Sequence, residues 1–150
     1  MPKSDSIKKY DFEYETHYKN TIIKHKQYVF DGKLYTKSKL IILRKNKEIK
    51  RKEYYTNGIL NNIKKAAIYE YYANKKIKLK MYYTDGKLHK IGKPALKFYN
   101  KKGKKICEAY FEFGNLHREN GPAYIWYCKD GEEEYIMSCE FGKYISSFFV

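Results

Sequence analysis

The sequence is short of several residue types, and each shortage excludes a class of protein. It has three prolines and nine glycines in 150 residues, too few for a Pro- or Gly-rich linker protein. The three cysteines are odd in number and form no C-x-x-C pair, which argues against a disulfide framework. No apolar run approaches the roughly 18 residues of a membrane-spanning helix, and residues 1–10 are too polar for a signal peptide. We therefore expect a soluble, cytoplasmic protein without a transmembrane segment.

Aromatic residues are abundant but unevenly chosen. There are 18 tyrosines and 8 phenylalanines against one tryptophan. Tyrosine is enriched in β-strands and tolerates a position that is half buried and half exposed to water. The composition therefore indicates a folded chain that is rich in β-structure.

Basic charge dominates, and it is unevenly distributed. The net charge is +15. Residues 1–105 contain 29 basic and 9 acidic side chains, whereas residues 106–150 contain 3 basic and 8 acidic ones. Such charge keeps a tyrosine-rich protein in solution, but the asymmetry favours a basic working surface for a polyanionic or acidic partner.

An internal repeat of about 28 residues is the clearest signal in the chain. Five glycines follow one another at intervals of 26, 28, 28 and 28 residues: Gly32, Gly58, Gly86, Gly114 and Gly142. A second turn signal lies 12 residues before each glycine, at Asn20, Asn46, Asn74, Lys102 and Asp130. Asn, Asp and Gly tolerate the positive φ of tight hairpin turns, so each unit is predicted to be a β-hairpin.

Between the turns the hydrophobic pattern has a period of two. In residues 76–83, lysines and Tyr82 alternate with Ile77, Leu79 and Met81, as in a strand with one wet and one dry face. Residues 63–72 contain two alanines that favour a helix, but their place in the repeat makes a strand the better interpretation. We predict an all-β fold in which tandem hairpins form one elongated, twisted antiparallel meander sheet.

The repeat also divides the chain. Residues 1–150 are expected to form a single β-repeat domain. Within it we expect a disordered stretch at 1–9, a half unit at 10–20, the repeats at 20–142 and a closing strand at 143–150.

Two sequence elements carry a family resemblance. GNLHRENGPA at 114–123 and its weaker copy GKLHKIGKPA at 86–95 resemble the G-x-L-H-R-x-x-G-P-A repeat of giant-virus and phage proteins. YYTNGIL at 54–60 and YYTDGKL at 82–88 resemble the MORN-variant repeat. The resemblance implies a β-repeat architecture that serves as a scaffold, a membrane-associated module or a partner-binding surface. For a viral protein it also implies the host cytoplasm or the virion as location.

No motif calls for catalysis. There is no Walker A sequence and no Gly-rich loop before a helix, so no cofactor is expected. His89 and His117 occupy equivalent repeat positions, which favours a structural role in which each bonds a neighbouring strand or turn. Cys128 and Cys139 lack further ligands for zinc. We expect a protein that is not an enzyme and that holds no metal.

The strongest functional signal is a set of lysines and tyrosines at matching repeat positions. Aligning the long strands by their turns predicts that one face carries a lysine grid bordered by tyrosines: Lys24, Lys26, Lys50, Lys52, Lys78, Lys80, Tyr28, Tyr54 and Tyr82. Lysines can neutralise phosphates and aromatic rings can stack on bases, so this face is the candidate site for nucleic acid or another polyanion.

Other interpretations remain open. Lysines also protect exposed sheets from aggregation, and tyrosine rows also form by cross-strand packing. The chain could instead be a protein-interaction scaffold or a structural component of a viral assembly, with an acidic, viral or host protein as partner. Attachment to anionic lipid is a third class. In addition, Arg51 and Glu53 fall on the predicted dry face, which requires either water or a covering element there.

Overall fold

A computed structural model describes residues 12–30, 33–62, 64–127 and 133–149 of the chain. Within these ranges all regular secondary structure is β-strand, which confirms the predicted all-β class. The expected disordered stretch at 1–9 lies outside the described residues.

The strands run from one end of the chain to the other. The first half contains β1 Phe12–Tyr18, β2 Thr21–Phe30, β3 Lys33–Leu43, β4 Ile49–Thr56, β5 Ile59–Leu60, β6 Ile68–Tyr71, β7 Ile77–Met81 and β8 Tyr83–Thr84. The second half contains β9 Lys87–Leu88, β10 Leu96–Tyr99, β11 Lys105–Ala109, β12 Phe111–Glu112, β13 Asn115–Leu116, β14 Tyr124–Tyr127, β15 Glu133–Glu140 and β16 Lys143–Phe149.

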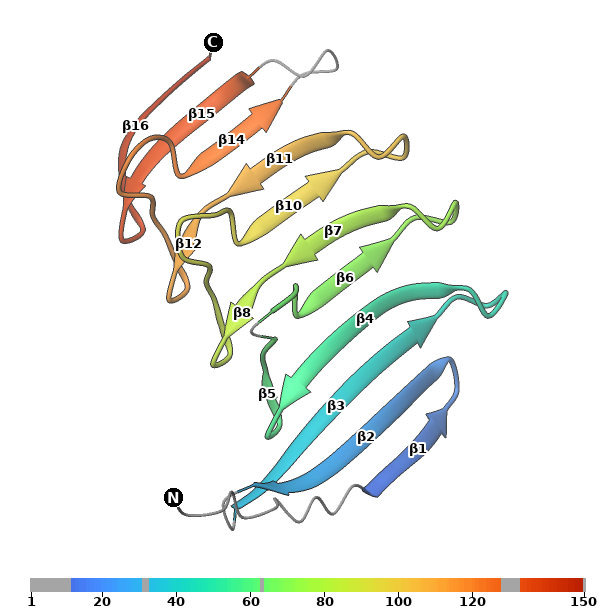
Figure 1. Cartoon of the computed structure of the whole chain (residues 1–150). Coiled ribbons are helices and arrows are strands. Elements are labelled where there is room, and N and C mark those ends of the chain that lie inside the picture. Colours follow the sequence, from blue (N-terminus) through green and yellow to red (C-terminus); the bar gives the residue numbers. More distant parts are fainter. Residues whose placement is uncertain (1–11, 31–32, 63, 128–132, 150) are drawn as a thin grey trace, which may run out of the picture.

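One antiparallel meander sheet contains most of these strands (Figure 1). Its order is β1-β2-β3-β4-β6-β7-β10-β11-β14-β15-β16, and β5 pairs with β4. The pairs β8-β9 and β12-β13 are short hairpins beside it. The strands of the main sheet therefore follow one another in the order of the chain, as stacked hairpin repeats require.

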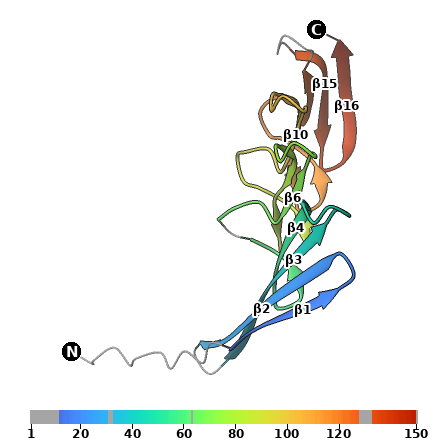
Figure 2. The same ribbon diagram turned by 90° about the vertical axis from the view of Figure 1, so that its right-hand side faces the viewer.

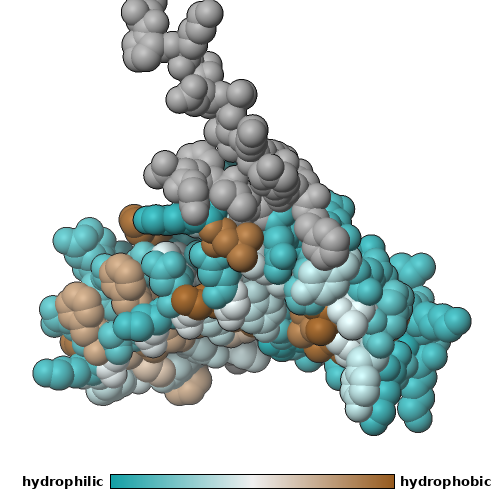
Figure 3. Space-filling model, turned by 90° about the horizontal axis from the view of Figure 1, so that it is seen from below, coloured by the Kyte–Doolittle hydropathy of each residue, from teal (hydrophilic) through white to brown (hydrophobic). Residues whose placement is uncertain are grey.

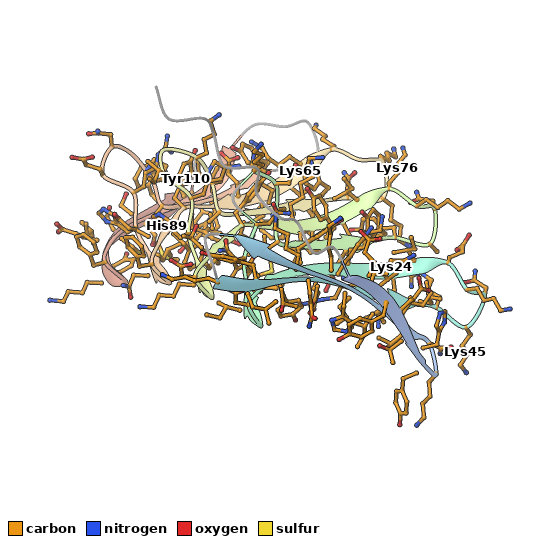
Figure 4. The ribbon with its side chains drawn as sticks, turned by 60° about the horizontal axis from the view of Figure 1, so that its bottom comes forward. Lys24, Lys45, Lys65, Lys76, His89 and Tyr110 are labelled. Atoms are coloured by element: carbon orange, nitrogen blue, oxygen red, sulfur yellow. The ribbon has the colours of Figure 1, made fainter. Side chains whose placement is uncertain are left out.

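The first turn of each repeat lies at one rim of the sheet, where Lys45 and Lys76 are labelled in Figure 4. Each described tip carries one residue with positive φ: Lys19 (50°), Lys47 (64°), Lys75 (65°) and Gly103 (92°). The residues expected at these tips are exposed. At the first tip Tyr18 pairs with Thr21, which leaves a two-residue turn at Lys19 and Asn20. At the second tip Lys47 N donates to Arg44 O at 2.9 Å and Arg44 N to Glu48 O at 2.7 Å, which closes a three-residue loop. The turn predicted at Asp130-Gly131 lies outside the described residues.

The glycine turns form the opposite rim. In each, a residue with φ of 44–50° precedes a glycine with φ of 75–92°, at Asn57-Gly58, Asp85-Gly86, Phe113-Gly114 and Phe141-Gly142. Two successive positive φ values are typical of a type I′ hairpin turn, as the sequence predicts. The last three glycines also bond the preceding repeat: Gly86 N donates to Leu60 O at 3.1 Å, and Gly114 N to Leu88 O and Gly142 N to Leu116 O, both at 2.9 Å. Gly32 lies outside the described residues.

After the hairpins at Gly58, Gly86 and Gly114 the chain leaves the sheet in a loop and returns to it. The loops that link β5 to β6, β9 to β10 and β13 to β14 protrude on one side of the sheet (Figure 2). Each re-enters at a completely buried alanine, Ala67, Ala95 or Ala123. The strand predicted over 63–72 is therefore shorter, Ile68–Tyr71, because the chain before it belongs to a loop. The first repeat differs, since β3 continues through this region as one strand of 11 residues.

The sheet is a single layer, and its core is thin. The most deeply buried residues are alanines, and no large side chain of the described residues is fully buried. Seen from the β1 end, hydrophobic residues form small separate patches within a mostly hydrophilic surface (Figure 3). Stability therefore depends on contacts between adjacent strands rather than on a central core.

Candidate functional site

Cross-strand register gathers lysines and tyrosines on one face of the sheet. Lys52 of β4 lies opposite Tyr69 of β6, Tyr69 opposite Lys80 of β7, and Lys80 opposite Lys97 of β10. Directly opposed residues point to the same side of a sheet. We call this side the tyrosine face; it carries Tyr54, Tyr69, Tyr71, Tyr82, Tyr99, Tyr110 and Tyr127.

Four of the residues predicted for the site lie together on this face. Lys52 and Lys80 share one row, with Tyr69 between them. Tyr54 and Tyr82 lie two residues further along their strands, and the N–H of each bonds the alanine of the adjacent loop. All four side chains are partly exposed. The two repeats therefore present the predicted lysines and tyrosines in equivalent positions.

β-Bulges separate Lys50 and Lys78 from this set. Arg51 pairs with Ile42 and Ile49 with Leu43, so that Lys50 is an extra residue in β4. Lys78 is the extra residue at the same place in β7. The Lys78 ammonium lies 3.6 Å from the Glu70 carboxylate and 5.7 Å from the Phe98 ring centroid, on the opposite face. A bulge places two consecutive residues on one side of a strand, which the two-residue period of the sequence does not reveal.

The predicted residues of the first repeat stand in a different register. Lys24 lies opposite Lys39 and Lys26 opposite Lys37, because β2 pairs with β3 along its whole length. The sheet does not bring Lys24 and Lys26 into the row of Lys52 and Lys80. For Tyr28 the main chain lies in β2, but its side chain is outside the described part of the structure.

Acidic side chains of β1 lie against these first lysines. The ammonium of Lys24 is 2.8 Å from the carboxylate of Glu15, and that of Lys26 is 2.7 Å from Glu13. The hydrogen bond from Lys24 lowers the pKa of Glu15 below its ordinary value, although desolvation by burial acts in the opposite direction. The lysines at this end are therefore partly neutralised by the protein itself.

A cavity of about 840 Å³ opens at the same end. Its lining includes Lys24, Lys39 and Tyr54 from the strands, and Asn62 and Lys64 from the first loop. Burial lowers the pKa of Lys39, and the charges of Lys52 and Lys24 lower it further. The positive charge on this side is thus concentrated enough for the lysines to repel one another.

Two further cations on the tyrosine face come from the loops. The Lys90 ammonium lies 3.2 Å from the centroid of Tyr82, and the Arg118 guanidinium lies 4.0 Å from that of Tyr110. Burial lowers the pKa of Lys90, followed by the effects of Lys93 and Lys80. Sequence reasoning missed these residues, although Lys90 and Arg118 occupy equivalent positions in GKLHKIGKPA and GNLHRENGPA.

The opposite face has a different composition. Apolar side chains such as Ile68, Met81 and Leu96 lie side by side on it. At its N-terminal end Arg51 bonds Glu53 at 2.5 Å and Glu70 at 2.6 Å, and Glu53 is only 8% exposed. Mutual ion pairing therefore accounts for the charged residues on the predicted dry face, without a covering element.

The two repeat histidines connect successive repeats. His89 Nδ1 accepts a hydrogen bond from Phe113 N at 3.3 Å, and its ring stacks on Phe113 with the centroids 4.2 Å apart. His117 makes the same two contacts with Phe141. These contacts confirm that both histidines bond a neighbouring turn.

The described residues offer little support for metal binding or for a reactive thiol. They contain no group of three His, Cys, Asp or Glu side chains that could hold a metal ion. Cys107 and Cys139 are buried and free, and burial raises the pKa of the Cys107 thiol, which lowers its reactivity. Cys128 is outside the described ranges. No helix in those ranges is long and apolar enough to span a bilayer.

Comparison with protein-family models, with curated proteins and with solved structures found no significant match to this chain.

Proposed function

We propose that the chain is a binding module without catalytic activity, which holds nucleic acid on the tyrosine face. The observation that carries this proposal is a group of cations without acidic partners. Among the described residues, no carboxylate forms an ion pair with Lys39, Lys52 or Lys80. Repulsion between such lysines is relieved when phosphate groups approach them.

The arrangement along the sheet supports an extended ligand. Lys52 and Lys80 occupy strands that are separated by β6, so their backbones are about 10 Å apart. Lys97 continues the same row on β10. A row of cations across several strands suits a chain of phosphates better than a single small anion.

The test is to replace Lys39, Lys52 and Lys80 together by Gln and to measure nucleic-acid affinity over a salt series. Each lost phosphate contact lowers the slope of log affinity against log salt by about 0.7–0.9, so three contacts should lower it by about 2. The matched control replaces Lys45, Lys101 and Lys102, which lie exposed at the hairpin tips. Melting curves of both variants show whether the sheet is intact.

The control variant should retain most of the slope. Equal losses in the two variants would mean diffuse attraction to a cationic protein and would contradict a site on the tyrosine face. Absence of binding by the parent chain at low salt would exclude the function itself.

A protein-interaction role is the second candidate, and it is favoured by exposed aromatic residues at the β16 end of the sheet. Tyr144, Phe148 and Phe149 are 63%, 54% and 79% exposed. Exposed aromatic side chains are typical of protein interfaces. Capture of an acidic or viral protein partner through this end, with no nucleic-acid binding, would support the second candidate.

A further inference from the structure

Most tyrosine rings of the tyrosine face are in contact with a cation of the protein. A cation lies over six of them, which form two series with a spacing of 28 residues. In the first series Lys39 lies over Tyr54, Lys90 over Tyr82 and Arg118 over Tyr110, at 5.7, 3.2 and 4.0 Å from the ring centroids. In the second, Lys52 lies over Tyr71, Lys80 over Tyr99 and Lys105 over Tyr127, at 5.2, 5.6 and 4.5 Å.

The remaining ring of the central region is occupied by other rings. Tyr69 packs edge-on against Tyr54 with the centroids 6.2 Å apart, and it stacks with Tyr71 at 6.5 Å. Stacking of a nucleic-acid base requires a free ring face. On this surface a base would first have to displace a cation or another ring.

A tyrosine ring that lies against a lysine ammonium can instead restrict the position of that lysine. A free lysine loses side-chain entropy when it is fixed by a ligand. A cation–π contact restricts the lysine before the ligand arrives, so that less entropy is lost on binding. The ammonium keeps its outward N–H groups, which can then bond phosphate oxygens.

We infer that the tyrosine face recognises the phosphate backbone of nucleic acid without reading or stacking its bases, and that Tyr71 and Tyr99 position the ammonium groups of Lys52 and Lys80. This inference rests on the proposed function. It differs from the expectation that the rings bind bases, because here the rings contact lysines and the lysines contact the ligand.

The experiment compares three probes: a single-stranded oligonucleotide, its duplex, and inorganic polyphosphate, which has no bases. The parent chain should bind both nucleic acids with a similar salt slope, and polyphosphate should compete with both. Changing Tyr71 and Tyr99 together to Leu should weaken binding of all three probes by the same factor, about two- to five-fold for each ring. Changing both to Phe retains the rings and should leave affinity unchanged.

Three results would overturn the inference. One is a single strand that polyphosphate does not displace. Another is a Tyr71→Leu, Tyr99→Leu variant that loses affinity for the single strand alone, because that loss would come from base stacking. The third is an equal loss in the Phe variant, which would assign the effect to the hydroxyl groups. In each case the parent chain still binds nucleic acid, so these results are distinct from failure of the proposed function.

Discussion

The third and fourth repeats have the same backbone but opposite charge at one place on the tyrosine face. In the third repeat the Lys80 ammonium lies 5.6 Å from the centroid of the Tyr99 ring, and Ile77 is three residues earlier in β7. In the fourth repeat the equivalent residues are Lys105 and Glu108, beside Tyr127. There the Glu108 carboxylate accepts a hydrogen bond from the Tyr127 hydroxyl at 2.9 Å and pairs with Lys105 at 2.7 Å.

Two sequence differences distinguish the two arrangements. Lys80 of the third repeat is replaced by Glu108 in the fourth, and Ile77, three residues earlier, is replaced by Lys105, which pairs with that glutamate. Glu108 is only 7% exposed, so its charge is used within the protein. The row of cations without acidic partners therefore ends between β10 and β11, although the sheet continues.

The largest effect is expected at the glycine turns, where loss of stability tests whether the third and fourth repeats form the same turn. Gly86 and Gly114 have φ of 75° and 92°, where a β-branched residue is strained, so replacement of either by Val should cost about 1–3 kcal/mol of unfolding free energy. Gly86→Val should be the more costly, because its Cβ would lie 3.2 Å from Ile59 Cγ2, whereas the space at Gly114 is open. Urea unfolding measures both. Lys87→Val, at an exposed position in β9, should remain within about 0.5 kcal/mol of the parent, and equal values for all three would contradict the assigned turns.

An intermediate effect is expected at Glu108. Glu108→Lys removes the hydrogen-bond acceptor of the Tyr127 hydroxyl and places a second cation beside Lys105. This change should lower the free energy of unfolding by about 1–3 kcal/mol. Adding Lys105→Ile recreates the combination of Ile77, Lys80 and Tyr99 and should recover most of the lost stability. The double variant should also steepen the salt slope for nucleic acid by about 0.7–0.9, the value of one more phosphate contact. A double variant as unstable as the single one would show that the two repeats are not equivalent.

The smallest effect concerns Glu15, one of the two acidic residues of β1. Glu15→Gln removes the carboxylate that contacts Lys24 and should steepen the salt slope by at most about 0.9. Glu140→Gln, which makes the same charge change at the far end of β15, should leave the slope unchanged. A decrease in slope for Glu15→Gln would contradict competition between this carboxylate and the ligand.

Lowering the pH tests the same ion pair between Glu15 and Lys24 without a substitution. The pKa of Glu15 is lowered by the hydrogen bond from Lys24, so this ion pair is present above the ordinary carboxyl pKa and is lost only as pH falls through the lowered value. Mild acidification should therefore not release Lys24 for ligand binding.

The architecture was predictable because turn chemistry is local. Asn57-Gly58 and Asp85-Gly86 require no partner elsewhere to adopt two positive φ values, and the constant spacing of the turn glycines fixes the length of the repeat. Phe113-Gly114 and Phe141-Gly142 adopt the same turn, and there the histidine of the preceding repeat bonds the phenylalanine N–H. The position of β1 within the expected half unit and that of β16 within the expected closing strand follow from the same spacing.

The composition of the tyrosine face was less predictable. Counting alternate residues back from each turn placed Lys50 and Lys78 beside Lys52 and Lys80, but a bulge adds one residue to that count. The first repeat has the continuous strand β3 in place of the loop that follows the glycine hairpin in the later repeats. Its strand register therefore could not be predicted from theirs. Lys90 and Arg118 contact their tyrosines only because the loops fold over the face, which is a tertiary contact that strand periodicity does not encode.

The single layer has a consequence for how the chain loses its structure. Since each repeat contacts only the repeats beside it, the free energy of the whole is the sum of the repeats and of the interfaces between them, as in a one-dimensional array. A histidine strengthens two of these interfaces, at Phe113 and Phe141. The corresponding position before them is Asn61, whose amide lies 3.5 Å from the Asp85 carboxylate. The boundary between the second and third repeats is therefore held by other side-chain contacts, this amide and the ion pair between Arg51 and Glu70, so the interfaces differ in kind along the sheet.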